Sequence, residues 1–192
     1  MPDTPFVPLE TPRLILRRLR PEDAAAFAAY RNDPEVARYQ SWSAYDLEAA
    51  TALILDQRSA VPGTPGTWFQ FALERRADGV LVGDCGLRTE ESDPKRGELG
   101  FTVARAHQRH GYAREAVSRV LDHAFGALGF EAVRAVTDVL NAPSIALLER
   151  LGFRREAPGS RLTWFKGRWS DEHAFEISAA EWRARRDHAS RG

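Results

Sequence analysis

The sequence has a single cysteine, no net charge and no long hydrophobic run. Because Cys85 stands alone, the chain can form neither an internal disulfide nor a cysteine-based metal cluster. No stretch approaches the roughly 18–20 apolar residues that a membrane-spanning helix needs. The N-terminus carries acids and prolines but no basic stretch followed by an apolar block, so it does not resemble a signal peptide. These absences predict a cytoplasmic protein with no membrane partner.

The charge balance argues against partners that are bound through bulk positive charge, and it leaves only a local basic patch as an alternative. The chain has 27 Lys and Arg against 27 Asp and Glu, and proteins that bind nucleic acid by bulk charge carry a positive excess. We therefore expect no nucleic-acid partner. With 192 residues, 43% of them hydrophobic, the chain is long enough to bury the core of one ordinary domain.

Hydrophobic periodicity predicts strands and helices in the first half of the chain. A strand over 13–19 is followed by helices that begin near Pro21 and Asp46. Two strands, 68–75 and 80–88, are joined by a hairpin signal. The helix over 46–59 has four candidates for core positions, which are Leu47, Leu53, Ile54 and Leu55.

The second half has the clearer pattern. Residues 98–103 alternate, with Leu99, Phe101 and Val103 on one face and Glu98 on the other. The apolar spacing over 113–128 is typical of an amphipathic helix. The remaining predicted elements are a strand at 133–139, a short helix from Asn141, and late strands at 153–156 and 173–177.

This order of elements predicts an α/β (or α+β) fold. One strand–helix–strand unit among hairpin-linked strands favours a mixed central sheet of about six or seven strands with helices on both faces. We expect a single domain over 13–182. An irregular arm at 1–12 precedes it, and a solvated tail at 183–192 follows it.

A candidate phosphate site lies between a strand and the best helix. The segment Gln108–Arg114 offers the unpaired amides of a helix start, two arginines, and a glycine that permits close approach. Small residues also begin helices for packing reasons, so that alternative stays open. Because the segment matches neither GxGxxG nor GxxxxGK[ST], dinucleotide and Walker sites are disfavoured.

Two segments, LGFTVARAHQRHGYAREAV and NAPSIALLERLGF, carry a family resemblance. They resemble the GNAT acetyltransferase superfamily, and more narrowly the RimJ/RimL-type N-acetyltransferases, which modify protein N-termini or small amines. Gln108, Gly111 and Ala113 match a Q-x-x-G-x-A element, and Asn141 and Ser144 match an N-x-x-S element. The resemblance runs from about residue 10 to residue 182, and the opening ETPRLILRRLRPEDAAAFAAYRNDPEVARY is also typical of that branch.

The resemblance implies a binding site for acetyl-CoA, as cosubstrate, between two splayed parallel strands. Backbone groups of Phe101, Thr102 and Val103 would pair with the pantetheine arm, and Asn141 would hydrogen-bond to it. Ser144 would lie near the sulfur. The loop and helix start would hold the diphosphate, with Gln108, Arg109, His110, Gly111, Tyr112, Ala113 and Arg114 as the expected residues.

The implied reaction is direct attack of an amine on the thioester. Ser144 would donate a proton to the leaving thiolate, and a backbone N–H near Val103 would stabilise the oxyanion. Some relatives carry a glutamate where this chain has Thr163, which is a poor base. Glu98, on the cofactor strand, is the expected substitute that orients or deprotonates the amine.

Several residues have plainer interpretations. Glu98 can be a paired surface carboxylate, Ser144 a helix cap, and Cys85 a small buried hydrophobe. The five histidines show no metal-ligand spacing, so we predict no metal. His107 and His110 flank the loop as possible phosphate contacts. Four tryptophans are candidates for lining an acceptor cleft, namely Trp42, Trp68, Trp164 and Trp169.

The sequence thus predicts an N-acetyltransferase whose partner is an amine acceptor, either a protein N-terminus or a small molecule. Acceptor choice would lie in the loops at 32–45, 60–67 and 157–172, and the chain would be a monomer or a homodimer. One alternative is a CoA-binding regulatory or interaction module with weak or no catalysis. A second is another small-molecule enzyme on a nucleotide-binding α/β fold.

Overall fold

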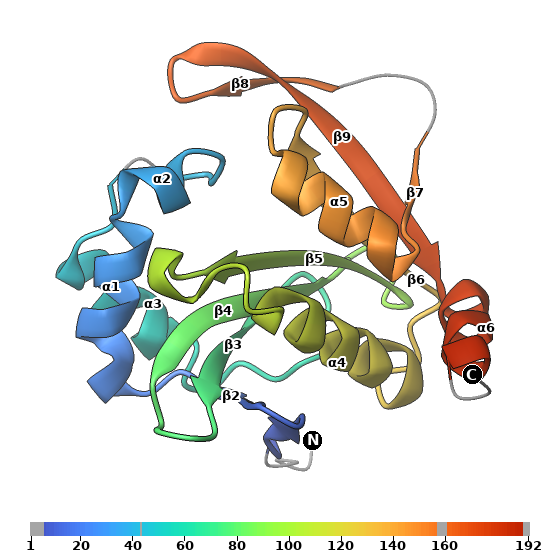
Figure 1. Ribbon diagram of the computed structural model, residues 1–192, viewed down its shortest axis with the longest axis horizontal. Coiled ribbons are helices and arrows are strands. Elements are labelled where there is room, and N and C mark those ends of the chain that lie inside the picture. The colour runs from blue at the N-terminus through green and yellow to red at the C-terminus, as the bar shows by residue number, and fades with distance from the viewer. Residues whose placement is uncertain (1–5, 43, 157–160, 190–192) are drawn as a thin grey trace.

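A computed structural model describes residues 6–42, 44–156 and 161–189. Its strands form one mixed sheet, and helices cover both faces (Figure 1). The elements in chain order are β1 (Leu9–Glu10), β2 (Leu14–Arg18), the 3-10 helix η1 (Pro21–Asp23), α1 (Ala24–Arg31), α2 (Pro34–Ala37), α3 (Leu47–Asp56), β3 (Trp68–Arg75), β4 (Leu81–Thr89), β5 (Arg96–Val103), the 3-10 helix η2 (Arg105–His107), α4 (Tyr112–Gly126), β6 (Ala132–Asp138), α5 (Ala142–Leu151), β7 (Arg154–Arg155), β8 (Arg161–Phe165), β9 (Arg168–Ser178) and α6 (Ala179–Ala189).

The sheet has the order β1-β2-β3-β4-β5-β6-β9-β7, and β8 pairs with β9 outside this path. β5 and β6 are parallel, and the other pairs among the described strands are antiparallel. The predicted fold class is confirmed. Among the described residues, the nine strands exceed the expected six or seven by two. These are β1, which is only two residues long, and β8, which lies between the two predicted late strands. β1 lies inside the predicted irregular arm, where it pairs with β2.

Alternation along β3 explains why helices cover both faces. Phe69, Phe71 and Leu73 point into the main core, where the apolar stripe of α4 packs. Ala72 points the other way and packs with α1 and α3 in a second cluster. The sheet is therefore buried on both sides in this region, as the sequence predicted.

α4 is the amphipathic helix that the spacing predicted, although it ends at Gly126 rather than 128. Its apolar stripe is almost wholly buried, through Ala116, Val117, Val120, Leu121, Ala124 and Phe125. Burying such a stripe stabilises the fold by about 1.5–3 kcal/mol for each large apolar side chain. This packing holds the N-terminus of α4 beside β5.

The core predicted for α3 is wrong in two positions. Leu47 and Leu55 are 56% and 53% exposed. α3 buries only a narrow stripe, with Ala50 and Ile54 inside and Leu53 partly covered, because only one side of it faces the sheet. The segment therefore has more apolar side chains than its narrow contact with the sheet can bury.

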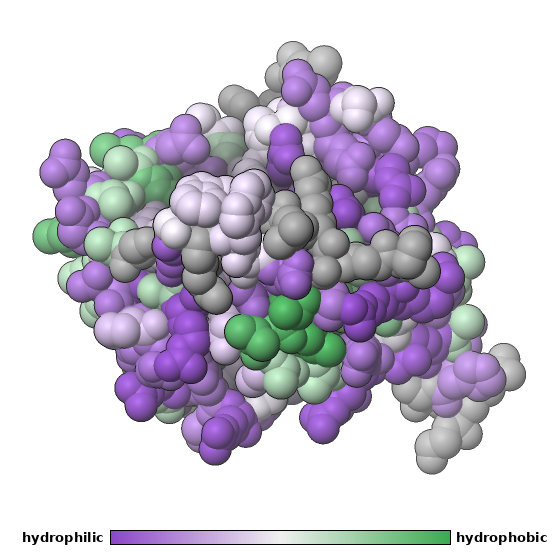
Figure 2. All heavy atoms as spheres, turned by 90° about the horizontal axis from the view of Figure 1, so that it is seen from above, coloured by the Kyte–Doolittle hydropathy of each residue, from purple (hydrophilic) through white to green (hydrophobic). Residues whose placement is uncertain are grey.

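The C-terminal helix α6 crosses the predicted boundary between domain and tail. Trp182 is buried in the main core, and its indole N–H donates to Asp122 Oδ1 of α4 at 2.8 Å. Among the described helices, none combines the length and the apolar character needed to cross a membrane. The face seen in Figure 2 is largely hydrophilic, with a compact hydrophobic patch near its centre and further hydrophobic atoms towards the left edge.

Candidate functional site

The site is built on a gap between β5 and β6. The two strands pair only from Arg96 with Ala132 to Glu98 with Arg134. Beyond that point β5 stays paired with β4 as far as Val103, and β6 stays paired with β9 as far as Asp138. The facing edges of β5 and β6 therefore diverge and leave backbone groups free to bind an extended ligand.

Strand alternation decides which groups point into the gap. The N–H of Ala104 donates to the carbonyl of Val82 on the β4 side, so in this antiparallel pair the backbone groups of Thr102 also face β4. A Cβ at Gly83 of β4 would collide with the Thr102 carbonyl oxygen, in agreement with this direction. The backbone groups of Phe101 and Val103 face the gap instead. The predicted backbone role thus fits Phe101 and Val103, whereas only the side chain of Thr102 lines the cavity.

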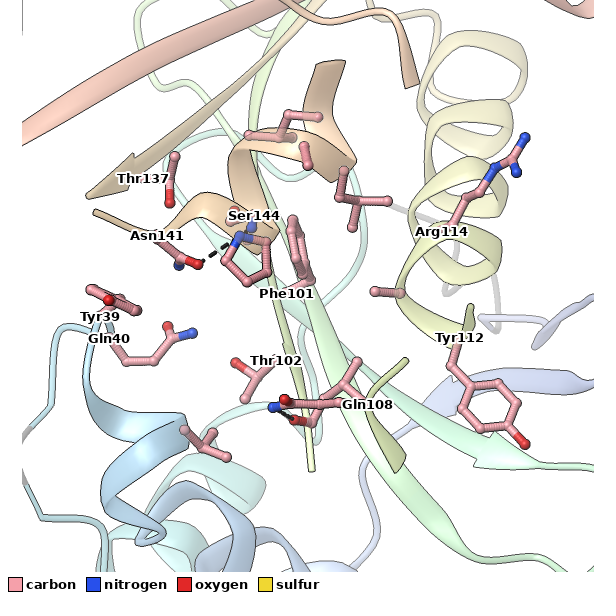
Figure 3. Close-up of a pocket in the computed structure, with 18 of the residues that line it drawn as sticks. Tyr39, Gln40, Phe101, Thr102, Gln108, Tyr112, Arg114, Thr137, Asn141 and Ser144 are labelled. Carbon is pink, nitrogen blue, oxygen red and sulfur yellow. Dashed lines mark hydrogen bonds between the residues drawn. The ribbon is translucent and has the colours of Figure 1, made fainter. Parts of the chain in front are cut away.

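A cavity of about 930 Å³ occupies the gap and extends to the start of α4 (Figure 3). This volume is within the usual range for ligand pockets. The predicted cofactor residues that line it are Phe101, Thr102, Val103, Gln108, Arg109, Gly111, Tyr112, Ala113, Arg114, Asn141 and Ser144. His110 and Glu98 are the two predicted site residues that do not line it.

The loop before α4 presents a row of unpaired amides. Among the described residues, none accepts a hydrogen bond from the backbone N–H groups of 109–114. Arg109 and Gly111 both have left-handed backbone conformations, with φ of 64° and 81°. Consecutive amides at a helix start form a concave, electropositive surface that binds anions. The loop therefore has the geometry of a phosphate site.

The side chains of Gln108 and His110 form hydrogen bonds or ring contacts within the loop or with the end of β5. The side-chain N–H of Gln108 donates to the Val103 carbonyl at 3.1 Å, as Figure 3 shows, and occupies one of the free groups of β5. The His110 ring lies 2.7 Å from the Gln108 carbonyl through Nδ1 and stacks on Tyr112. His110 can therefore contribute its backbone N–H, while its ring braces the loop.

The opposite wall begins with Asn141, which is the N-cap of α5. Its Oδ1 accepts the Ser144 N–H at 3.3 Å, so Ser144 enters the cap through its backbone (Figure 3). The interpretation of the Ser144 side chain as a helix cap is therefore wrong. The Asn141 amide keeps its two donors for a ligand. The Ser144 hydroxyl lies at the cavity wall, where a leaving group can reach it.

Glu98 lies on the far face of β5 from Leu99. It stands opposite Arg88 of β4 and beside Arg134 of β6, outside the residues that line the cavity. Gly100, one alternate position along the same face, does line the cavity. Thr163 pairs with Ser170 in the β8–β9 hairpin.

Part of the segment 32–45, one of the three loops expected to decide acceptor choice, lines the cavity, but sequence reasoning did not name its individual residues. Glu35, Arg38, Tyr39 and Gln40, in α2 and just after it, line the cavity. Tyr39 and Gln40 face the Asn141 side of the cavity in Figure 3. Since α2 is only four residues long, no periodicity marks it in the sequence.

A buried ion pair ties this wall to the sheet. Arg31, the last residue of α1, donates to Asp84 of β4 at 2.5 Å, and the two side chains are 7% and 0% exposed. Gln70 donates to the same carboxylate at 3.0 Å. The Arg31 guanidinium also stacks 4.2 Å from the rings of both Phe27 and Trp42. Because Asp84 pairs with Thr102, the contact links α1 to the cofactor strand.

Cys85 is fully buried in the main core, as expected for a small hydrophobe. Burial raises the pKa of its thiol far above the usual range, so it is not a thiolate nucleophile. Burial and the nearby charges of Arg75 and His110 lower the pKa of His107. Within the described part of the chain, no group of three or more His, Cys, Asp or Glu side chains is arranged to hold a metal ion.

The prediction that tryptophans line an acceptor cleft finds no support at this cavity. None of them is among the described residues that line the cavity. The indole N–H of Trp42 donates to the Arg31 carbonyl at 2.9 Å, so this ring supports the buried ion pair. Trp164 and Trp169 form an exposed edge-to-face pair on the β8–β9 hairpin. The tip of this hairpin reaches α2, where Lys166 Nζ donates to the Ala37 carbonyl.

Comparison with known proteins agrees with this geometry. A family model described as an acetyltransferase (GNAT) domain matches residues 13–154. YoaA of Bacillus subtilis (strain 168), an uncharacterized N-acetyltransferase, is 33% identical over 174 residues, which cover 90% of this chain and 97% of the relative.

Solved structures show the same architecture. A GNAT-family acetyltransferase from Bacillus anthracis has a TM-score of 0.81 at 22% identity, covering 91% of this chain and 100% of that one. Mycobacterium smegmatis RimJ in complex with CoA-disulfide has a TM-score of 0.77 at 26% identity, covering 91% and 87%. By its fold, its family match and its relatives, this chain belongs to the GNAT family of N-acetyltransferases.

Proposed function

We propose that the protein transfers the acetyl group of acetyl-CoA to an amine, either the α-amine of a protein N-terminus or a small-molecule amine. One observation carries this proposal: a row of unpaired amides at 109–114 lies at the end of a gap whose strand edge is free. An anion site beside an open strand edge matches a ligand that has a diphosphate and an amide-bearing arm.

In the proposed reaction, the amine nitrogen bonds to the thioester carbonyl carbon and the carbon–sulfur bond breaks. The Val103 N–H, which faces the gap, would donate to the oxyanion as charge develops. The Ser144 hydroxyl would give a proton to the departing thiolate and regain one from solvent. The attacking amine would lose its proton to water, since the one carboxylate among the described residues lining the cavity, Glu35, is paired with Arg38 at 2.8 Å.

Ser144→Ala is expected to lower kcat by about a hundredfold, the lower end of what a positioned proton donor contributes. The dissociation constant for CoA should stay nearly constant, because the cap of α5 uses the backbone of Ser144. Steady-state kinetics and calorimetry measure the two quantities. Ser118→Ala on α4 is the control, since Ser118 does not line the cavity. Equal kcat in both variants would contradict the role of Ser144.

Glu98 is proposed to orient the ammonium form of the acceptor through its negative charge. It lies two residues before Gly100 on the same face of β5, and Gly100 lines the cavity. Exposed charge pairs contribute roughly 0.2–1 kcal/mol, so Glu98→Gln should raise KM for the amine by about two- to fivefold with kcat unchanged. Glu48→Gln on α3 is a matched control. A large loss of kcat in Glu98→Gln would show instead that Glu98 is the base.

The experiment that tests the function is a thiol-release assay with acetyl-CoA over a panel of amines and N-terminal peptides. We expect acceptor-dependent release of CoA. Tight CoA binding with no acceptor-dependent release would favour a CoA-binding regulatory module. Preferential binding of ATP or NAD over CoA would favour a different enzyme on this fold.

A further inference from the structure

The start of α4 is bridged to the N-terminal segment by one carboxylate. Glu115 Oε1 accepts hydrogen bonds from the Thr11 hydroxyl at 2.6 Å and from the Arg13 N–H at 2.8 Å. Glu115 Oε2 accepts from Arg13 Nε at 2.6 Å and lies 2.6 Å from Nη2. The carboxylate is largely buried, with its side chain 14% exposed. This Arg13–Glu115 bridge joins segments about a hundred residues apart.

The same guanidinium holds the loop that carries the free amides. Arg13 Nη1 donates to the His110 carbonyl at 2.8 Å, and the group stacks 4.9 Å from the centre of the Tyr112 ring. Its Nη2 lies 3.3 Å from the position that a Cβ on Gly111 would occupy. Arg13 therefore contacts His110 and Tyr112, the residues on either side of Gly111.

A loop of this shape needs outside support. Arg109 has a left-handed backbone conformation, which is unfavourable for any residue except glycine. Among the residues that the structure describes, no group accepts a hydrogen bond from the loop amides and so fixes them. A strained backbone conformation persists only where contacts with surrounding residues hold it in place. The Arg13–Glu115 bridge supplies that constraint.

The Arg13–Glu115 bridge also neutralises the negative charge of Glu115 near the loop amides. Glu115 carries a negative charge in the first turn of α4, beside the amides that would hold a diphosphate. Hydrogen bonds from Thr11 and Arg13 and the Arg13 charge outweigh burial and lower the pKa of this carboxyl, so it is ionised at neutral pH. Arg13 neutralises a charge that would otherwise repel the ligand.

We propose that Arg13 and Glu115 are positioning residues that set the 109–114 amides for the diphosphate of CoA. Through Thr11, the predicted arm at 1–12 then also supports the cofactor site. The proposal rests on the proposed use of acetyl-CoA. It predicts an order of CoA affinities among variants of Arg13 and Glu115 that a change in folding stability alone would not produce.

The test measures the dissociation constant of CoA by calorimetry, together with the melting temperature of each free variant. Arg13→Gln should weaken CoA binding by about tenfold or more, since a charge-assisted hydrogen-bond pair is lost and Glu115 is left unpaired. The double variant Arg13→Gln/Glu115→Gln should bind CoA more tightly than Arg13→Gln, because the repelling charge is gone. Arg13→Lys should fall between wild type and Arg13→Gln.

The matched control is Arg119→Gln. Arg119 Nε donates to the Glu10 carbonyl at 3.2 Å, so it ties the same N-terminal segment to α4 one turn beyond Glu115. This variant should bind CoA like wild type. If Arg13→Gln binds CoA as tightly as wild type, or if the double variant is no better than Arg13→Gln, the proposal is wrong.

Inorganic pyrophosphate separates this proposal from the proposed function. In NMR titrations of wild type it should shift the amide signals of 109–114, and in Arg13→Gln the same shifts should need about tenfold more ligand. Wild type that binds pyrophosphate at these amides but not CoA would overturn the proposed function and keep the bridge. Equal pyrophosphate titrations in wild type and Arg13→Gln would overturn the bridge.

Discussion

Gly111→Glu is expected to abolish CoA binding. At φ of 81° a side chain is strained, and its Cβ would lie 3.3 Å from Arg13 Nη2. The carboxylate would also stand among amides that would hold a diphosphate. Two unit charges 4 Å apart near a protein surface repel by about 4 kcal/mol. That alone corresponds to about a thousandfold in affinity. Calorimetry with CoA measures the loss.

Gly126→Glu is the matched control for this prediction. Gly126 lies at the other end of the same helix, where an added Cβ would meet no atom within 4 Å. The control introduces the same charge on the same element and should leave CoA binding unchanged. Binding retained by Gly111→Glu would contradict the assignment of the loop.

Asp84→Asn is expected to lower the free energy of unfolding by about 3–5 kcal/mol, because it leaves Arg31 as an uncompensated buried charge. The substitution keeps the shape of the side chain, so the effect isolates charge. Phe27 and Tyr45 of the second core stack on the Arg31 guanidinium, and α2 begins shortly after Arg31. Urea unfolding followed by circular dichroism measures the change.

The exposed pair Arg75–Asp78 provides the comparison. Its atoms are 2.6 Å apart, as in a strong contact, but the side chains are 27% and 44% exposed. Asp78→Asn should therefore cost only about 0.2–1 kcal/mol. If Asp84→Asn and Asp78→Asn lower the free energy of unfolding by similar amounts, burial of the Arg31–Asp84 pair does not increase its contribution to stability.

The parts of the site that could be predicted from the sequence depend on local chemistry. The glycine-bearing segment at 108–114 precedes a helix with a clear apolar stripe, and both features are visible along the chain. The cap at Asn141 likewise acts three residues away, on Ser144. Local rules of this kind are reliable because the partners are neighbours in sequence.

The rest depends on contacts between distant residues. The wall at 35–40 is placed by Arg31 and Asp84, which are 53 residues apart. The bridge from Arg13 to the start of α4 spans 102 residues. The direction of the Thr102 backbone follows from the register of β4 against β5, which no pattern within β5 reveals. Alternation along β5 correctly placed Glu98 opposite Leu99, but it could not show that the cavity stops short of Glu98.

The central claim is that the 109–114 amides hold a diphosphate at one end of the gap between β5 and β6. A crystal structure of the protein with bound CoA tests it most directly. We predict diphosphate oxygens within hydrogen-bond distance of those amides, and the pantetheine arm along the backbone of Phe101 and Val103. CoA bound at another surface, with these amides turned towards solvent or covered by side chains, would contradict the claim.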